Sequence, residues 1–296
     1  MVTRIHEKIP SNIRRDTPQS IKEIYSYTSI FLKKLFVSSH FWISDEQVDK
    51  YFQDKKIFFL LSFGRSGSKW LADLLNIAPR ALVVHEPFIE TIPHQKAFND
   101  PMKAENYISK FRKREIWSRI NTLDVYVYGE VNSFLRRHCV SLKRAIPNAV
   151  LLHIVRDGRD VVRSMYSRDT MMPRAYDTKR ISPKKNDPWR VEWYKMSRFE
   201  KLCWYWMVEN KYLRKCVGNT VQFEKIISDY EYFSKNILKP LNLTISKKIW
   251  EEKINEPKNI SDDYMISHWS KWGQEKDFFN KICGEEMRIN GYELNW

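Results

Sequence analysis

Two segments of the chain, about ninety residues apart, each lead from an apolar strand into a polar, basic turn and then into a helix. The first, residues 57 to 70, reads IFFLLSFGRSGSKW, and the second, residues 151 to 164, reads LLHIVRDGRDVVRS. A short unbroken apolar run is typical of a strand buried on both faces of a parallel sheet. Because the carboxyl ends of parallel strands meet at one edge of a sheet, we expect the two turns to form halves of one anion-binding site.

The first turn has the composition of an anion-binding loop. Gly64 and Gly67 allow the backbone to curl, and apolar residues recur at helical spacing from 70 to 75. A tight turn between a strand and a helix points backbone N–H groups, and the positive end of the helix dipole, at one place. Arg65 and Lys69 add full positive charges there.

The second turn supplies further anion-binding groups. We expect a strand over 150–155, a turn from Arg156 to Gly158, and a helix that starts near Arg159. Arg156 and Ser164 can then both reach one phosphate at the carboxyl end of the strand. The guanidinium fork fits phosphate oxygens, and the serine hydroxyl is a neutral donor.

The motif of a P-loop kinase or NTPase is incomplete in this chain. That motif requires Gly-Lys followed by Ser or Thr, whose hydroxyl holds magnesium. Here Ser68 precedes Lys69, and Trp70 follows it. We therefore predict a phosphate-bearing donor whose reaction needs no metal, and no metal-binding residues. An ATP-dependent P-loop small-molecule kinase is the alternative.

Taken together, the two segments resemble the sulfotransferases that use 3′-phosphoadenosine 5′-phosphosulfate, PAPS. Residues 63–70 are similar to the loop that binds the 5′-phosphosulfate in that family. Arg156 and Ser164, eight residues later, match the arginine and serine that hold the 3′-phosphate. The resemblance implies a P-loop-NTPase-like sulfotransferase fold, an α/β three-layer sandwich whose central parallel sheet is flanked by helices. It also implies PAPS as co-substrate and PAP, its desulfated form, as product.

The resemblance also suggests roles for individual residues. Arg65 takes the place of the basic residue that contacts the 5′-phosphate and the transferred sulfonate. Trp70 falls where some members stack a tryptophan on adenine, although core packing is an equal reading. The arginine at position 65 is more typical of carbohydrate and protein-tyrosine sulfotransferases than of cytosolic steroid and phenol enzymes, and many members have Ser or Thr in place of Lys69. The candidate nucleotide-binding residues are Arg65, Ser66, Gly67, Ser68, Lys69, Trp70, Arg156, Ser164 and Lys271.

Sulfonate transfer needs a base that accepts the acceptor's proton, and Glu86 is the first candidate. It follows an expected strand over 81–84, where carbohydrate and tyrosylprotein sulfotransferases are similar in having a catalytic glutamate. We expect Pro87 to hold Glu86 in extended geometry. The alternative is a structural ion pair with Arg65 or Lys69.

Two other residues are candidates for the base. Glu130 follows an expected strand over 125–128, close to where the cytosolic enzymes have their catalytic histidine, but capping of a helix over 133–145 is equally open. His85 is the third candidate, although a histidine at a strand end is more often a hydrogen-bonded, partly buried residue. Arg65 is expected to stabilise the departing phosphate.

Strands and helices alternate along most of the 296 residues, which predicts a parallel sheet covered by helices. We assign residues 51–296 to a single sulfotransferase domain and residues 1–50 to an N-terminal arm. The arm contains an amphipathic helix from Ile21 to Trp42. This helix either packs on the domain, contacts a membrane surface or forms a dimer.

The net charge of +15 suits an anionic donor and allows an anionic acceptor. Nucleic-acid binding is a competing reading, but no helix-turn-helix, zinc or RNP-like signature accompanies the charge. We therefore expect transfer to a hydroxyl or amine of a small-molecule or glycan acceptor, and no nucleic-acid partner.

The four cysteines are scattered without a C-x-x-C pattern, so neither a zinc site nor a disulfide framework is expected. This favours a reducing compartment and a cytoplasmic location. No signal peptide is evident, and no run approaches the roughly 20 apolar residues that span a bilayer. The cysteines are Cys139, Cys203, Cys216 and Cys283.

Overall fold

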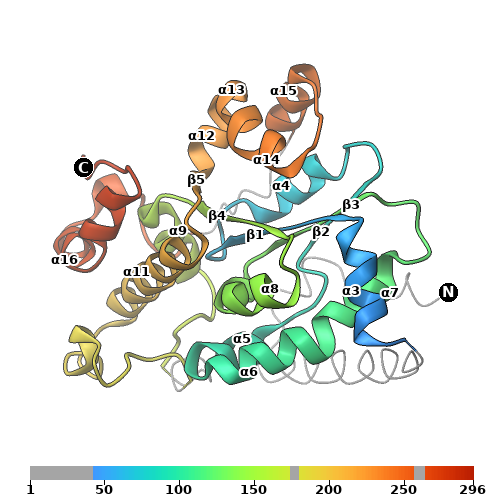
Figure 1. The fold of residues 1–296 in the computed structure, drawn as a ribbon. Coiled ribbons are helices and arrows are strands. Elements are labelled where there is room, and N and C mark those ends of the chain that lie inside the picture. Colours follow the sequence, from blue (N-terminus) through green and yellow to red (C-terminus); the bar gives the residue numbers. More distant parts are fainter. Residues whose placement is uncertain (1–42, 174–179, 257–263) are drawn as a thin grey trace.

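A five-stranded parallel sheet forms the centre of the computed structural model, which describes residues 43–173, 180–256 and 264–296. The strand order is β2-β3-β1-β4-β5, and helices cover both faces (Figure 1). This confirms the predicted α/β class with a central parallel sheet between helical layers. The predicted N-terminal helix lies outside the described residues. The strands are β1 (Lys56–Ser62), β2 (Ala81–His85), β3 (Val127–Asn132), β4 (Val150–Val155) and β5 (Thr220–Gln222).

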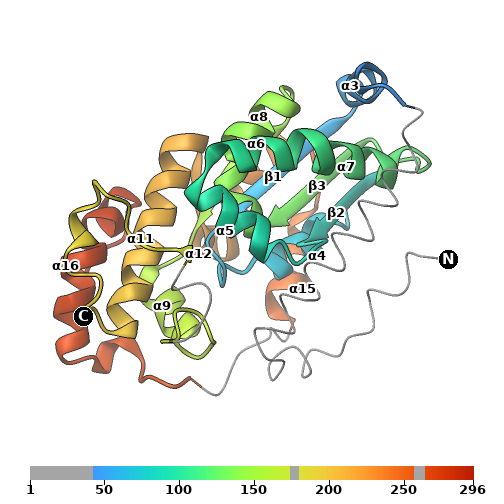
Figure 2. The same cartoon turned by 90° about the horizontal axis from the view of Figure 1, so that it is seen from below.

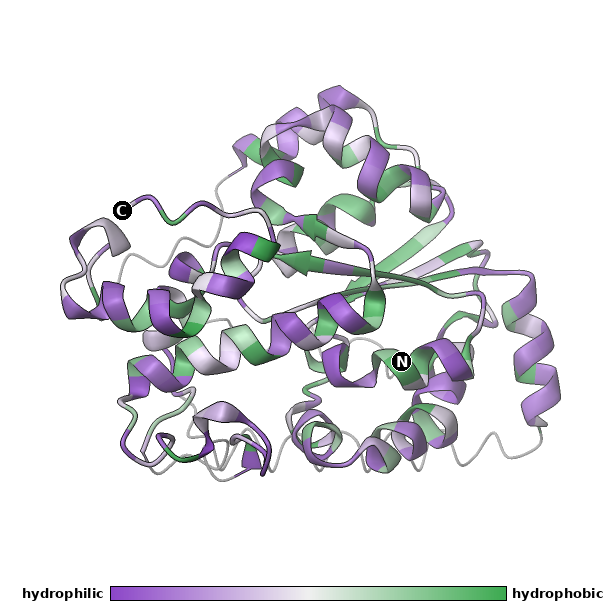
Figure 3. Ribbon diagram, turned by 60° about the vertical axis from the view of Figure 1, so that its left-hand side comes forward, coloured by the Kyte–Doolittle hydropathy of each residue, from purple (hydrophilic) through white to green (hydrophobic). Residues whose placement is uncertain are grey.

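Strand β1 is buried on both faces because its alternate side chains enter two different apolar clusters. Phe58 and Leu60 pack with the cluster that contains α4 (Ser68–Leu75) and the helices after β5. Phe59 and Leu61 pack on the opposite face, with α3 (Asp45–Gln53), α7 (Lys113–Ile120) and α8 (Cys139–Ala145). Hydrophobic residues accordingly gather on the strands and on the helix sides turned toward them (Figure 3). The helices after β5 are α12 (Phe223–Ser228), α13 (Tyr230–Phe233), α14 (Lys239–Leu241) and α15 (Lys247–Asn255), with η5 (Ser234–Leu238) between α13 and α14.

A third apolar cluster lies beside β4 and is built on helices α9 (Gly158–Tyr166), α11 (Arg198–Val217) and α16 (Gln274–Ile289). Trp204 and Trp206 of α11 are fully buried there. Helix α11 begins with a capping box between Ser197 and Glu200. This packing fixes α9, and with it the turn after β4.

The face of the sheet that carries Phe59 and Leu61 is covered by a long helical stretch. Helix α5 (Thr91–Asn99), which no sequence pattern predicts, leads into α6 (Pro101–Tyr107), the π-helical turn η2 (Ile108–Arg112) and α7 (Lys113–Ile120) (Figure 2). Helix α3 (Asp45–Gln53) packs on α7. The helix predicted over 133–145 begins as a 3-10 turn, η3 (Phe134–His138), and continues as α8 (Cys139–Ala145).

Two expectations about the fold are wrong. Strand β3 runs over Val127–Asn132 and not over 125–128, so that Glu130 lies inside the strand and is fully buried. Cys139 of α8 and Cys216 of α11 form a disulfide, although no disulfide was expected. Their separation of 77 residues in the sequence gave no pairing signal. In the described part of the chain, the helices are too short or too polar to cross a membrane.

Candidate functional site

The two basic turns lie side by side, because β1 and β4 are neighbouring parallel strands whose carboxyl ends point the same way. Arg65 Nε donates a hydrogen bond to Ser164 Oγ at 2.8 Å. Arg156 Nη1 donates to the carbonyl oxygen of Arg65 at 3.0 Å. Arg65 is therefore in direct contact with both the second turn and the helix that follows it.

In the part of the chain that the structure describes, the loop after β1 leads into α4 without a side-chain cap on the first N–H groups of that helix. Arg65 and Gly67 both have φ of 71°, in the left-handed region. A Cβ added to Gly67 would lie 2.1 Å from the ring of Phe223, so this position needs glycine for space as well as for conformation. Gly67 is the N-cap of α4 and no side chain caps that helix, so in this part of the chain its first N–H groups point into the loop. Ser66 Oγ bonds the carbonyl of Phe63 at 2.6 Å and is buried.

Phe223, which directly follows β5, connects the two turns. The guanidinium of Arg156 lies 5.7 Å from the centre of its ring. Trp70 meets the same ring edge to face, with centroids 6.0 Å apart. The indole N–H of Trp70 donates to the carbonyl of Lys253 at 2.9 Å, which fixes the half-buried tryptophan against α15.

Lys69 and Lys271, two of the candidate nucleotide-binding residues, are exposed. Lys69 pairs with Asp73 one turn along α4, and 62% of its side chain is exposed. Lys271 ends the 3-10 turn η6 (Trp269–Lys271), which contacts α9. Trp269 of that turn donates through its indole N–H to Asp160 at 3.1 Å.

The arginines within α9 turn away from the loop after β1. Arg159 pairs with Asp157 and donates to the carbonyl of Asn295. Arg163 lies over the ring of Tyr264, 3.8 Å from its centre. Arg156, which precedes the helix, is the arginine of this segment that contacts the first turn. Its second amino group pairs with Asp160 at 3.2 Å.

Glu86 and His85 lie at the end of β2, near the start of α4. His85 Nε2 is 2.9 Å from Ser68 Oγ and 3.9 Å from Glu86 Oε1. Glu86 has φ of 40°, which corrects the expected extended geometry. Two hydrogen bonds hold this conformation. The backbone N–H of Glu86 donates to the carbonyl oxygen of Val131, and Oε1 of its side chain accepts from the hydroxyl of Ser133. Nearly a quarter of the Glu86 side chain, 23%, is exposed.

Glu130 has a different environment from Glu86. Arg112 donates to both of its carboxylate oxygens, at 2.5 and 2.6 Å, and the hydroxyl of Tyr128 donates to one of them. The same guanidinium pairs with Glu90 at 2.9 Å and with Glu115. Burial raises the pKa of Glu90 to about 7, against the opposing effect of the arginine. Glu130 is thus a partner in a buried ion-pair network and does not cap a helix.

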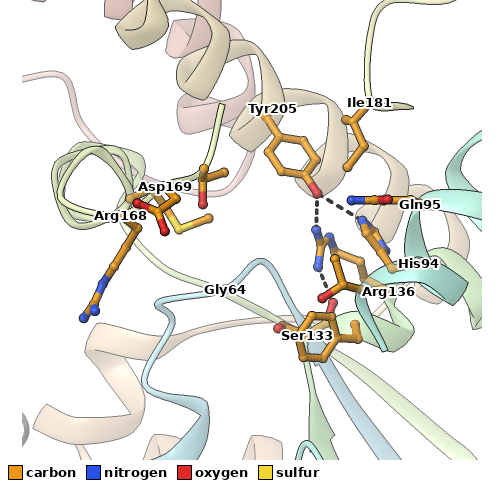
Figure 4. A pocket seen from close by; sticks show the side chains of 13 residues that line it. Gly64, His94, Gln95, Ser133, Arg136, Arg168, Asp169, Ile181 and Tyr205 are labelled. Carbon is orange, nitrogen blue, oxygen red and sulfur yellow. Dashed lines mark hydrogen bonds between the residues drawn. The ribbon is translucent and has the colours of Figure 1, made fainter. Parts of the chain in front are cut away.

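A cavity of about 270 Å³ adjoins the loop after β1. In Figure 4, Arg136, Tyr205 and His94 are linked by hydrogen bonds on one side of it, and Arg168 and Asp169 lie on the other. Gly64 of the loop and Ser133 after β3 form part of its wall. The cavity therefore adjoins the first turn through Gly64, and it adjoins Glu86 through Ser133, which bonds that carboxylate.

A buried acid stabilises the cationic side of the cavity. Glu209 of α11 pairs with Arg137 at 2.8 Å and with Arg136 at 3.4 Å. Burial alone would raise the pKa of Glu209, but the two arginines outweigh it and lower the pKa to about 2. Burial lowers the pKa of His94 to about 4, so this ring is neutral at pH 7.

Sequence reasoning missed several residues of this region, including Phe223, Ser133, Arg136 and Tyr205. Ser133 had a usable signal, because it directly follows a strand of a parallel sheet and such positions line ligand sites. Arg136 and Tyr205 lie 69 residues apart in the sequence, and no local pattern pairs them.

No protein-family model matches the sequence, and no curated protein matches it. Among solved structures, a sulfotransferase from Mycobacterium avium aligns with a TM-score of 0.48 and 11% identity, over 83% of this chain and 82% of its own. A mouse sulfotransferase complexed with PAP aligns with a TM-score of 0.46 and 16% identity, over 82% and 89%. A sulfotransferase from Alicyclobacillus acidocaldarius gives 0.44 and 13%, over 81% and 97%.

Proposed function

We propose that this chain is a PAPS-dependent sulfotransferase that transfers a sulfonate group to a hydroxyl or amine of a polar acceptor, such as a sugar or small metabolite. The contact between Arg65 and Ser164 carries the proposal, because it joins two turns that the sequence separately assigns to opposite ends of one nucleotide. The arginine at position 65 and the glutamate after β2 favour the carbohydrate and tyrosylprotein type over the cytosolic steroid and phenol type.

The charges and the backbone around the two turns fit a doubly phosphorylated nucleotide. In this proposal Arg65 and the N–H groups from Ser66 to Lys69 bind the 5′-phosphosulfate, since a helix N-terminus and a guanidinium both favour an anion. Arg156 and Ser164 bind the 3′-phosphate. Trp70 packs against adenine, and Lys271 adds positive charge from the C-terminal part of the chain.

In the proposed reaction, the acceptor oxygen or nitrogen forms a bond to sulfur, and the bond from sulfur to the 5′-phosphate oxygen breaks. The electron pair of the broken bond leaves on that phosphate oxygen, where Arg65 and the loop N–H groups stabilise it. Glu86 accepts the proton of the acceptor. Its partial exposure at a strand end supports this choice over Glu130, whose two oxygens already bond Arg112.

The cavity beside the loop supports a polar acceptor. Its wall includes His94, Gln95 and Tyr205, which offer hydrogen bonds, together with the charged Arg168 and Asp169. At about 270 Å³ it is slightly below the usual range of roughly 300–1,000 Å³ for ligand pockets, which suits a single reacting unit. Transfer of radiolabelled sulfonate from PAPS to a metabolite and glycan extract would identify the acceptor class.

The sequence and the disulfide point to different cellular compartments. The sequence favours a cytoplasmic location, but the Cys139–Cys216 disulfide argues against a reducing compartment, because disulfides are rare there. Residues 21–42, for which the sequence predicts an amphipathic helix that can contact a membrane surface, lie outside the described residues.

Calorimetric titration with PAP tests the proposed nucleotide site. We expect saturable binding that Arg156→Ala weakens, while Arg163→Ala on the neighbouring helix has little effect, because its guanidinium lies over Tyr264. Absence of PAP binding in the unmodified protein would refute the proposal. A nucleic-acid-binding protein would instead bind oligonucleotides with a steep salt dependence that Arg156→Ala leaves in place.

Turnover measurements separate the enzyme classes and the candidate bases. Sulfonate transfer should persist in EDTA, whereas an ATP-dependent kinase would need magnesium and ATP. Glu86→Gln should abolish transfer and leave PAP affinity unchanged, and His85→Gln should keep most of the activity. If Glu130→Gln abolished transfer in a folded protein while Glu86→Gln did not, the base would be misassigned.

A further inference from the structure

Ser133 donates two hydrogen bonds to one oxygen of the Glu86 carboxylate. Oε1 accepts a short hydrogen bond from Ser133 Oγ and a weaker one, at 3.4 Å, from the backbone N–H of the same serine. For Oε2, the described chain shows no hydrogen bond. A carboxylate can accept about four hydrogen bonds, so Oε2 keeps its accepting capacity.

We infer that Ser133 is a positioning residue that fixes Oε1 of Glu86 and directs Oε2 toward the proton of the acceptor. This inference rests on the proposed function. In the transfer step the acceptor's proton goes to Oε2, while its oxygen or nitrogen bonds to sulfur and the phosphate oxygen of PAP leaves with the electron pair. Ser133 neither gives nor takes a proton.

Ser133 is well placed for this role because its own position is fixed. It follows β3 directly and is 5% exposed. Its carbonyl oxygen accepts a hydrogen bond from Arg136, whose guanidinium also donates to Tyr205 of α11. The side chain of Asn132, the last residue of β3, accepts from the N–H of Phe134 at 2.9 Å and closes the turn around the serine.

The serine hydroxyl also lies where the loop, the cavity and the carboxylate meet. Ser133 is part of the cavity wall, together with Gly64. A Cβ built on Gly64 would have Ser133 Oγ as its nearest neighbour, at 3.9 Å. Ser133 therefore connects the cavity wall to the Glu86 carboxylate.

Two charged or titratable groups near Glu86 are His85 and Arg136. His85 Nε2 lies 3.9 Å from Oε1, and Arg136 interacts electrostatically with the carboxylate. Substitution of Ser133 removes neither group. A change at the Glu86 carboxylate in a Ser133 variant would therefore report the lost hydrogen bond.

Carbon-13 NMR of carboxyl-labelled protein at one fixed pH tests the inference, with the Glu86 signal identified by its loss in Glu86→Gln. A hydrogen bond to a carboxylate oxygen changes the chemical shift of the carboxyl carbon, so we expect Ser133→Ala to displace this signal. Ser133→Cys should displace it less, because a thiol is a weaker donor, and Ser133→Thr should restore its position. Ser141→Ala, at another buried serine, is the control.

The rate of sulfonate transfer from radiolabelled PAPS to the same metabolite extract supplies a second measurement. It should fall about tenfold in Ser133→Ala and return in Ser133→Thr, with PAP affinity unchanged in all variants. An unmoved Glu86 signal in Ser133→Ala, or no restoration in Ser133→Thr, would overturn the inference. Loss of PAP binding in every protein would instead defeat the proposed function, while the NMR signal would still decide whether Ser133 holds Glu86.

Discussion

Arg65 Nε donates a hydrogen bond to Ser164 Oγ over 2.8 Å, although 99 residues separate the two in the sequence. The bond joins the loop after β1 to the helix after β4. Neither residue can therefore move far without changing the position of the other.

Because of this contact, we expect Arg65 and Ser164 to be coupled in nucleotide binding. Arg65→Ala should weaken PAP binding about tenfold to a hundredfold, the range for hydrogen bonds to charged groups. Ser164→Ala should weaken it less, and the double variant should lose less than the sum of the two. Calorimetry on the four proteins measures this coupling. The pair Arg65→Ala with Arg163→Ala should be additive, and additivity in both pairs would contradict a shared site.

Gly67 combines an unusual backbone conformation with a close contact, and the two effects can be separated. We expect Gly67→Ala to lower the free energy of unfolding more than Gly218→Ala does. Both residues have positive φ, which costs an alanine about 1–2 kcal/mol. Only at Gly67 would the new Cβ meet another ring, that of Phe223 at 2.1 Å, whereas nothing lies within 4 Å of a Cβ at Gly218.

Urea denaturation of the two alanine variants checks this comparison. Phe223→Leu should destabilise the Gly67→Ala protein less than it destabilises the unmodified protein, because it relieves the clash. Equal costs at positions 67 and 218 would mean that the loop moves away from Phe223 without penalty.

Sequence patterns predicted the strands whose apolar runs are long, interrupted in β4 only by His153. Strands β1 and β4 have long apolar runs, and their predicted positions agree with the structure to within a residue or so. Strand β3 was misplaced because it contains Glu130 and Asn132, which are polar. Its stability in the core depends on Arg112, 18 residues earlier in the sequence. Such a partner cannot be recognised from local hydrophobicity.

The same limit applies to the candidate site. Glycines and arginines next to apolar strands indicated the two turns, because strand and turn are adjacent in the sequence. The contact of Phe223 with Gly67, Trp70 and Arg156 depends on the packing of β5 against β4, which no local pattern encodes. Helix α5 was missed because its buried side chains include His94 and Gln95, so it lacks an apolar stripe.

The disulfide should contribute measurably to stability. Reduction, or the double variant Cys139→Ala with Cys216→Ala, should lower the free energy of unfolding by about 2–4 kcal/mol, since it lengthens the unconstrained chain in the unfolded state. Urea denaturation with and without reductant measures the effect. Cys203→Ala should keep the response to reductant, because Cys203 is a free thiol. Four reactive thiols in unreduced, denatured protein would show that the bond does not form.

The network around Arg112 should respond strongly to loss of its cation. Arg112→Met leaves the buried carboxylates Glu90 and Glu130 without their shared partner, so we expect a loss of about 3–5 kcal/mol. Adding Glu130→Gln should recover part of it by removing one negative charge. Arg114→Met is the matched control, because Arg114 pairs with exposed Asp45 and such pairs contribute about 0–1 kcal/mol. Chemical denaturation at pH 8 measures both losses of unfolding free energy. Equal losses in Arg112→Met and Arg114→Met would show that the network is unimportant.

Three buried histidines should make the fold sensitive to mild acid. Burial lowers the pKa of His94 and of His153 to about 4, and that of His138 to about 3, from an ordinary value of 6.5. Between pH 6.5 and about 4 the unfolded chain therefore binds protons that the folded protein does not, and stability falls as the pH falls. Each ring contributes about 1.4 kcal/mol per pH unit in that window. Glu90, whose pKa is raised to about 7, acts in the opposite direction and offsets about one proton.

His138→Phe isolates one of these contributions, because the ring is buried against Tyr107 and a phenyl group has a similar shape. We expect this variant to be less sensitive to acid, with the slope of unfolding free energy against pH reduced by about 1.4 kcal/mol per unit below pH 6. Urea denaturation at pH 5, 6 and 7 measures the slope. Leu142→Met alters packing in the following helix without removing a titrating group, and its slope should match that of the unmodified protein. If His138→Phe also kept the full slope, His138 would be charged in the folded protein, contrary to its burial.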